Sequence, residues 1–138
     1  MRRKHAALAG LPTAAVLLLT GCAAAVSDDY VIENDPGHFE DGMVHLDDGA
    51  AERLGLETTT VVRNGKGLEV PDTAVFVDPE GNWWVYTSPE PDVYVREQID
   101  LEHQSDGRSL FSSGPEAGTE VVTVGVAELY GVEAEVGH

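Results

Sequence analysis

The only cysteine in the sequence, Cys22, is the residue whose surroundings point most clearly to chemistry. It follows Leu19-Thr20-Gly21, and the four residues match the bacterial lipobox, in which the thiol receives a diacylglyceryl group and the cysteine becomes the new N-terminus. Two acyl chains are enough for stable attachment to a membrane. The alternative is an ordinary secretion signal with a chance cysteine. We expect Cys22 to be lipidated and to anchor the chain outside the cytoplasm.

Histidines among acidic residues are the next candidates, because imidazole and carboxylate groups together can bind Zn²⁺ or Cu²⁺. They are His38, His45, His103 and His138. No two of them stand at i, i+2 or i, i+4 spacing, which would bring two imidazoles to one face of a strand or helix. The pairs Asp28-Asp29 and Asp47-Asp48 lack the spacing of an EF-hand loop. We expect surface histidines, no metal site and no cofactor.

Catalytic motifs are missing from the sequence. No cysteine follows Cys22, and there is neither a Gly-x-Ser-x-Gly elbow nor a Gly-x-x-x-x-Gly-Lys phosphate loop. The 25 Asp and Glu residues create chance carboxylate pairs, so spacing alone cannot identify an acid–base pair. We expect the protein not to be an enzyme.

The pair Trp83-Trp84 is the most unusual local feature. Adjacent residues of a strand point to opposite faces, so one indole should lie inside and the other outside. Trp83 shares a face with Val85, which we assign to the core. Trp84 then either lies under a neighbouring loop or contributes to a contact patch, because exposed aromatic residues often dominate interfaces. The candidate patch consists of Trp84, Tyr86, Pro89 and Pro91.

The charge is strongly negative. All 25 acidic residues but only five of the eight Lys and Arg residues follow residue 21, so a chain cleaved before Cys22 would carry a formal charge of −20. Nucleic acids and anionic lipid surfaces are therefore not expected as direct partners. Self-association stays open but must overcome like-charge repulsion. A partner surface should be basic, or divalent ions should mediate the contact.

The elements that position these residues begin after a targeting segment. Residues 1–21 start with Arg2, Arg3 and Lys4 and continue with an apolar run that is too short to span a bilayer, as in a signal peptide. Residues 22–42 contain six acids and predict a lipidated flexible tether that becomes ordered near its end. We expect one folded domain over residues 43–131 and a disordered tail over residues 132–138.

Residues 43–131 show the pattern of short antiparallel strands separated by turn residues. A short helix is expected at residues 50–54, capped by Asp47 or Asp48 and ended by Gly55. The predicted fold is all-β, a small antiparallel β-barrel or sandwich with one short helix. Strands are expected at residues 43–46, 56–62, 67–70, 73–77, 83–87, 93–101, 108–111 and 120–126.

Residues 93–101 alternate most clearly between apolar and polar side chains. Their alternation predicts one buried face and one wet face. We assign Val93, Val95, Ile99 and Leu101 to the inner face, and Tyr94, Arg96, Gln98 and Asp100 to the outer face.

Three segments, in order, resemble a known family. They read VHLDDGAAERLGLETTTV (residues 44–61), VPDTAVFVDPEGNWWVYT (70–87) and FSSGPEAGTEVVTVGVAELYG (111–131). They are similar to the strand–helix–strand segment, the "VP..AV..d..G..wVyv" hairpin and the "sGl..Ge.VV..Ga..L" ending of the membrane fusion proteins, the HlyD-like periplasmic adaptors of resistance–nodulation–division exporters. The resemblance covers the membrane-proximal, C-terminal portion of such adaptors.

The departures from that family shape the functional expectation. A complete adaptor is several hundred residues long and has an α-helical hairpin and a lipoyl-like domain, neither of which this sequence contains. The resemblance therefore implies a shortened adaptor that docks on the extracytoplasmic face of an inner-membrane permease without bridging an envelope.

Two functions stay open at this point. The first is a lipid-anchored, non-catalytic accessory subunit of an efflux system. The second is a stand-alone acidic lipoprotein that binds a cation or a small solute.

Overall fold

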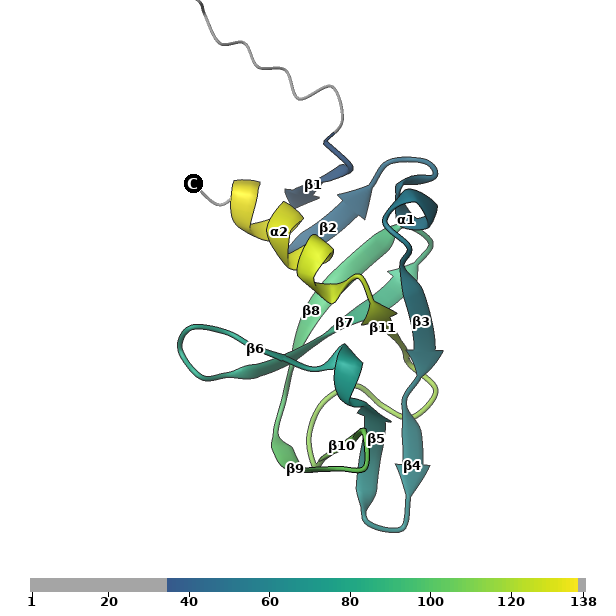
Figure 1. Cartoon of the computed structure of the whole chain (residues 1–138), viewed down its shortest axis with the longest axis vertical. Helices are drawn as coiled ribbons and strands as arrows, with labels where there is room; N and C mark the ends of the chain where they lie inside the picture. The colour runs from purple at the N-terminus through teal and green to yellow at the C-terminus, as the bar shows by residue number, and fades with distance from the viewer. Residues whose placement is uncertain (1–34, 137–138) are drawn as a thin grey trace, which may run out of the picture. The chain divides into compact units, whose positions relative to one another are not determined.

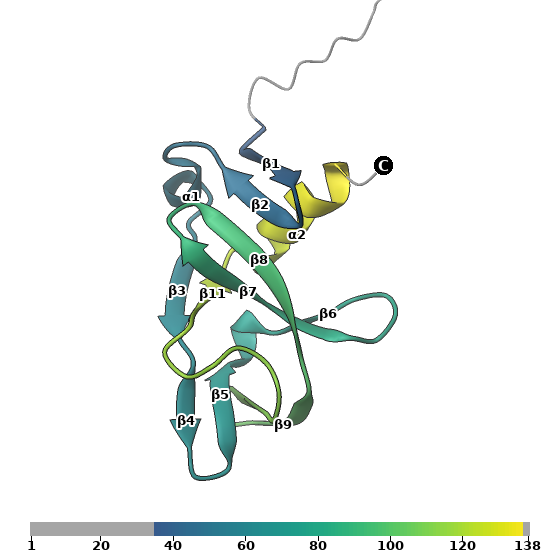
Figure 2. The same cartoon turned by 180° about the vertical axis from the view of Figure 1, so that it is seen from behind.

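The computed structural model of the chain describes residues 35–136, which form two antiparallel sheets with helices packed on one of them (Figures 1 and 2). Sheet A has seven strands, in the order β1-β2-β8-β7-β11-β3, and the short β6 also pairs with β7. Sheet B has four strands, in the order β4-β5-β10-β9. The predicted antiparallel β fold is confirmed in its sandwich form, because both sheets are open rather than closed into a barrel within this part of the chain.

The elements have the following bounds. Sheet A contains β1 (Gly37–Glu40), β2 (Met43–Leu46), β3 (Glu57–Thr60), β6 (Phe76–Val77), β7 (Trp83–Glu90), β8 (Val93–Ile99) and β11 (Glu120–Val124). Sheet B contains β4 (Val62–Asn64), β5 (Gly67–Pro71), β9 (Leu101–Ser105) and β10 (Arg108–Phe111). The helices are α1 (Ala50–Arg53), the 3₁₀ turn η1 (Asp72–Ala74) and α2 (Val126–Val136).

Two predicted strands each divide between the sheets. The chain leaves β3 and enters β4 at Val61, whose backbone N–H donates to Thr119 and whose carbonyl accepts from Gly118. It leaves β8 and enters β9 at Asp100, whose backbone bonds to Ser112 and Ser113. These junctions let one continuous extended segment serve both sheets.

The two layers enclose separate hydrophobic cores. The first core lies between sheet A and the helices, and its buried members are Val44, Leu46, Ala50, Tyr86, Tyr94, Val122, Leu129 and Val132. The second core lies between sheet A and sheet B, and its buried members are Val61, Leu68, Val70, Ala74, Val85, Ile99, Phe111 and Val121.

The central strands β7 and β11 are buried on both faces. Val85 and Val121 point into the second core, while their chain neighbours Tyr86 and Val122 point into the first. All four side chains are fully buried, as expected when successive residues of a strand face two packed layers.

The predicted limits of the domain were too narrow at both ends. β1 pairs with β2 from Gly37 to Glu40, so the last part of the expected 22–42 tether belongs to sheet A. Residues 126–136 form α2, and Leu129 and Val132 are buried. The prediction of a disordered tail from residue 132 is therefore wrong for residues 132–136; residues 137 and 138, like residues 1–34, lie outside the described part.

Gly125 makes the turn from β11 into α2. Its φ of 97° lies in the region that favours glycine, and the side chain of Leu56 packs directly over its α-carbon. This close contact lets α2 fold back over sheet A, where Figure 1 shows it in yellow across β2 and β8.

Local predictions had mixed outcomes. The tight turn predicted at Asn64-Gly65 forms one residue later, at Gly65 and Lys66, and the Asn64 side chain accepts hydrogen bonds from the backbone N–H groups of Lys66 and Gly67. Helix α1 forms where expected and Gly55 follows it with a φ of 68°, but its N-cap is Gly49 without a side-chain hydrogen bond, rather than Asp47 or Asp48. The expected strand 73–77 begins instead with η1.

The face assignment in β8 holds only at its end. Ile99 is buried in the second core and Leu101 packs against that core. Tyr94, assigned to the wet face, is only 5% exposed in the first core, whereas Val93 and Val95 are half-buried. The strand changes its buried face along its length because the helices cover one side and sheet B covers the other.

Candidate functional site

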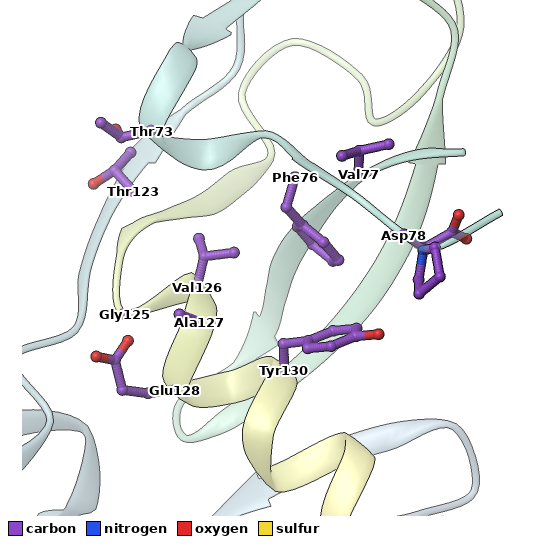
Figure 3. A pocket seen from close by; sticks show the side chains of 11 residues that line it. Thr73, Phe76, Val77, Asp78, Thr123, Gly125, Val126, Ala127, Glu128 and Tyr130 are labelled. Atoms are coloured by element: carbon purple, nitrogen blue, oxygen red, sulfur yellow. The ribbon is translucent and has the colours of Figure 1, made fainter. Parts of the chain in front are cut away.

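An apolar groove of about 710 Å³ runs between β6 and the start of α2 (Figure 3). Phe76 and Pro79 line the groove on the β6 side, and Val126 and Tyr130 line the helix side. Val77 also borders the groove, but its side chain points away from α2 in Figure 3. The remaining lining residues are Thr73, Asp78, Thr123, Gly125, Ala127 and Glu128. The groove lies within the size range of small-ligand sites, about 300–1,000 Å³.

The β6 wall exists because a short strand precedes a tight turn. Asp78 holds this turn: its Oδ1 accepts hydrogen bonds from the backbone N–H groups of Glu80 and Asn82 at 2.9 Å. The turn returns the chain into β7, where Val77 pairs with Trp83 and Phe76 with Trp84. Val77 remains 50% exposed, and it is one of three large apolar side chains so exposed in the described residues.

Aromatic rings line the groove where β6 meets the helix. Phe76 stacks on the buried Tyr86, with 5.1 Å between ring centroids, and meets Tyr130 edge-on at 5.8 Å. In Figure 3 the Phe76 and Tyr130 side chains point toward each other across the space between β6 and α2.

Both charged residues in the groove lining are acidic. Desolvation alone would raise the pKa of Asp78, but hydrogen bonds from the Asn82 and Glu80 backbones and from the Trp84 and Asn82 side chains lower this pKa to about 2. Asp78 is therefore ionised at any physiological pH. Glu128 lies exposed on the first turn of α2.

A chain of polar contacts ties α2 to the strands beside the groove. Glu133 of α2 accepts a 2.5 Å hydrogen bond from the Tyr86 hydroxyl and pairs with Arg96 of β8 at 3.3 Å. The Arg96 guanidinium also lies 4.4 Å from the Trp84 ring centroid, and the Trp84 Nε1 donates to Asp78 at 2.8 Å. Burial and then the Glu133 contact raise the pKa of Tyr86 far above its usual value.

The predicted contact patch does not assemble. Tyr86 is fully buried, because α2 covers the face of β7 that carries it. Trp84 is half-buried and engaged by Arg96 and Asp78. Pro89 and Pro91 are exposed, but Pro89 lies near the other end of β7, about 16 Å from Trp84 at the rise of a strand, and Pro91 lies beyond it in the turn to β8. The assignment of Trp83 to the Val85 face is confirmed by its packing against the second core.

The histidines show one arrangement that spacing did not predict. Pairing of β1 with β2 sets His38 opposite His45, and the rings stack with centroids 5.1 Å apart. His103 is exposed on β9. Within residues 35–136, no group of three or more His, Cys, Asp or Glu side chains is placed to hold a metal ion. Cys22, His138 and Asp28-Asp29 lie outside the described residues.

Sequence reasoning missed the groove, although two signals were present. Trp83 to Tyr86 form a continuous apolar run, which is typical of a strand covered on both faces. Val126, Leu129 and Tyr130 have the spacing of one helix face. Together they indicate a helix packed on the Tyr86 side of the sheet, with a groove where that helix approaches β6.

No protein-family model matches the sequence, and no curated protein matches it significantly. No helix in the described part of the chain is both long and apolar enough to cross a membrane.

Proposed function

We propose that the protein is a lipid-anchored, non-catalytic accessory subunit of an efflux system that docks on the extracytoplasmic face of a membrane permease. The observation that carries this proposal is that the three adaptor-like segments, which are separated in the sequence, meet in one folded unit. Strand β11 of the third segment pairs with β3 of the first and with β7 of the second.

Side chains join the same three segments. Leu56 of the first segment packs against Gly125 of the third, and Phe76 of the second meets Tyr130 of the third. Val44, Tyr86 and Leu129, one from each segment, share the first core. The three segments therefore pack as one unit, as a resemblance to a single adaptor domain requires.

The best-placed polar groups serve to hold elements together, which supports a non-catalytic role. Asp78 closes the β6–β7 turn, Glu133 fixes α2 to β7 and β8, and Glu69 pairs with Arg108 across β5 and β10 at 2.8 Å. The anchor in this proposal is the Cys22 thioether, and the formal charge of −20 favours a basic docking face on the permease.

Crosslinking in native membranes tests the proposal. A photoreactive residue at an exposed position such as Pro89 should yield adducts with a polytopic transport protein, identified by mass spectrometry. The Cys22→Ser variant should lose labelling by a fatty-acid probe, leave the membrane fraction and lose these adducts. Adducts only with soluble proteins, or a wild-type chain that is not acylated, would contradict the proposal.

A further inference from the structure

We propose that the outward face of the β1–β2 hairpin binds a soft monovalent metal ion, Cu⁺ or Ag⁺, through the imidazoles of His38 and His45 and the thioether of Met43. This inference goes beyond the adaptor role, because the site requires no permease. Residue spacing did not indicate the site, since positions 38 and 45 become neighbours only through the register of the hairpin.

The hairpin separates its apolar side chains from its metal-ligating ones. Phe39 packs against the first core, in which Val44 and Leu46 are buried. Successive residues of a strand point to opposite faces, so the neighbours of these three residues project from the face of sheet A that is turned away from the helices. The residues on that outward face of the hairpin are His38, Glu40, Met43 and His45.

Strand pairing brings the three metal-binding side chains together. His38 lies opposite His45, and the two rings stack with centroids 5.1 Å apart and planes within 11° of parallel. Met43 lies two residues before His45 on the same strand, so its side chain emerges beside the ring pair. A diagonal neighbour across two antiparallel strands is still within reach of a long side chain.

The ring arrangement defines what binding must change. The nitrogen lone pairs of an imidazole lie in the plane of its ring, so two parallel rings cannot both direct a lone pair at one ion. One ring must turn for the ion to be shared. The side chain of His38 is 57% exposed, so this ring can turn without displacing packed atoms.

The donor set selects the class of metal. Thioether sulfur is a soft ligand that favours Cu⁺, and imidazole also suits copper. Zn²⁺ instead uses thiolate, imidazole and carboxylate ligands in tetrahedral sites. Met43 is the only methionine besides Met1, and it lies on the same hairpin face as two of the five histidines. This combination favours a soft monovalent ion over Zn²⁺.

The surroundings of the site favour a cation. Glu40 Oε2 lies 3.7 Å from His38 Nε2 and places a negative charge beside the rings. Residues 35–52 contain no Lys or Arg. On the other side of β2, the residues that pair with His45 and Met43 are the uncharged Val93 and Val95. A bound cation therefore meets an acidic neighbour on β1 and no opposing charge on β8.

Titration with Ag⁺, which does not oxidise in air, tests the proposal. The full chain carrying Cys22→Ser, which removes a competing thiol, is titrated with silver nitrate and separately with zinc sulfate. Calorimetry measures affinity, and NMR follows the methionine methyl groups and the histidine ring protons. We expect the tightest-bound Ag⁺ to shift the Met43 methyl group and the rings of His38 and His45, and Zn²⁺ to bind more weakly. An unshifted Met43 methyl group, or tighter binding of Zn²⁺ than of Ag⁺, would overturn the proposal.

Matched variants separate the hairpin from other histidines and from the overall negative charge. Met43→Leu conserves the side-chain volume but removes the sulfur, and His38→Ala removes an exposed ring. Each should weaken Ag⁺ binding about tenfold or more. His103→Ala removes an exposed ring from β9 and should change the affinity by less than about twofold.

Thermal melting provides the folding control for these variants. Met43→Leu should melt like the Cys22→Ser parent, so its loss of Ag⁺ affinity reports the sulfur and not the fold. Equal losses of affinity in His38→Ala and His103→Ala, or an unchanged affinity in Met43→Leu, would contradict the site.

Discussion

The two cores differ in what closes them. The second core is aliphatic apart from Phe111 and is closed by a sheet, so cross-strand pairing holds both of its layers. The first core contains Tyr86 and Tyr94 and is closed by α1 and α2, whose attachment to the sheet depends on side chains. The hydroxyl groups of these tyrosines need hydrogen-bond partners, and the Glu133 carboxylate accepts a hydrogen bond from Tyr86. The comparison teaches that the helix-covered half of this domain depends on a few specific contacts, and that the same half forms the groove.

Removal of α2 should destabilise the first core more than any other change considered below. A chain ending at Gly125 loses Leu129 and Val132, whose burial contributes about 1.5–3 kcal/mol each, and also loses the Glu133 contacts. We expect a strongly lowered melting temperature and binding of a hydrophobic dye to the uncovered first core. A chain ending at Val136 serves as the control and should melt like the full chain. Equal melting of both truncated chains would mean that the helix does not close the first core.

A pair of valine and isoleucine truncations tests the face assignment in β8. Ile99→Ala removes a side chain that is 3% exposed in the second core and should cost about 2–5 kcal/mol of unfolding free energy. Val95→Ala, at a half-buried position outside both cores, should cost about 1 kcal/mol or less. Chemical denaturation measures both. A larger loss in Val95→Ala would reverse the assignment.

The adjacent tryptophans divide between the two faces of β7. Trp83→Ala should cost about 2–4 kcal/mol because the indole packs against the second core. Trp84→Ala removes one hydrogen bond and one cation–π contact and should cost about 1–2 kcal/mol. Thermal melts of the two variants and the wild type measure both losses of stability. A larger loss in Trp84→Ala than in Trp83→Ala would refute the assignment.

Tyr86→Phe removes only the hydroxyl group that the first core holds against Glu133. Loss of a hydrogen bond to the Glu133 carboxylate should cost about 1.5–3 kcal/mol near neutral pH. Because the folded state raises the pKa of Tyr86, its contribution is present below the unfolded value of about 10 and is lost as the pH rises beyond it. The wild type should therefore lose stability above about pH 10 more steeply than Tyr86→Phe. Parallel alkaline profiles would count against this assignment.

Asp78→Asn should have the smallest effect on folding. The pKa of Asp78 in the folded state is about 2, below its ordinary value, so the stabilisation by the carboxylate is present above about pH 4 and is lost as the pH falls toward 2. Between pH 4 and pH 2, the melting temperature of the variant should fall less than that of the wild type. An equal fall in the two proteins would show that the hydrogen bonds to the Asp78 carboxylate do not stabilise the turn.

Much of the β framework could be predicted from the sequence because local patterns encode it. Met43–Leu46, the tight turn after Asn64 and the hairpin around residues 78–82 appear where turn residues and alternation place them. The site could not be predicted in the same way. Its walls are Phe76 and Val126, which are 50 residues apart in the sequence and are brought together by the fold-back at Gly125.

The sequence by itself determined most strand and turn positions, the negative charge and the Leu19–Cys22 pattern that resembles a lipobox. These properties depend on residue type and on spacing over a few positions. Only the tertiary structure decided which face of each strand is buried, because alternation defines two faces without stating which layer covers each. Tyr86 and Tyr94 are buried in the core beneath the helices, whereas Ile99, farther along the same β8 strand as Tyr94, is buried by sheet B.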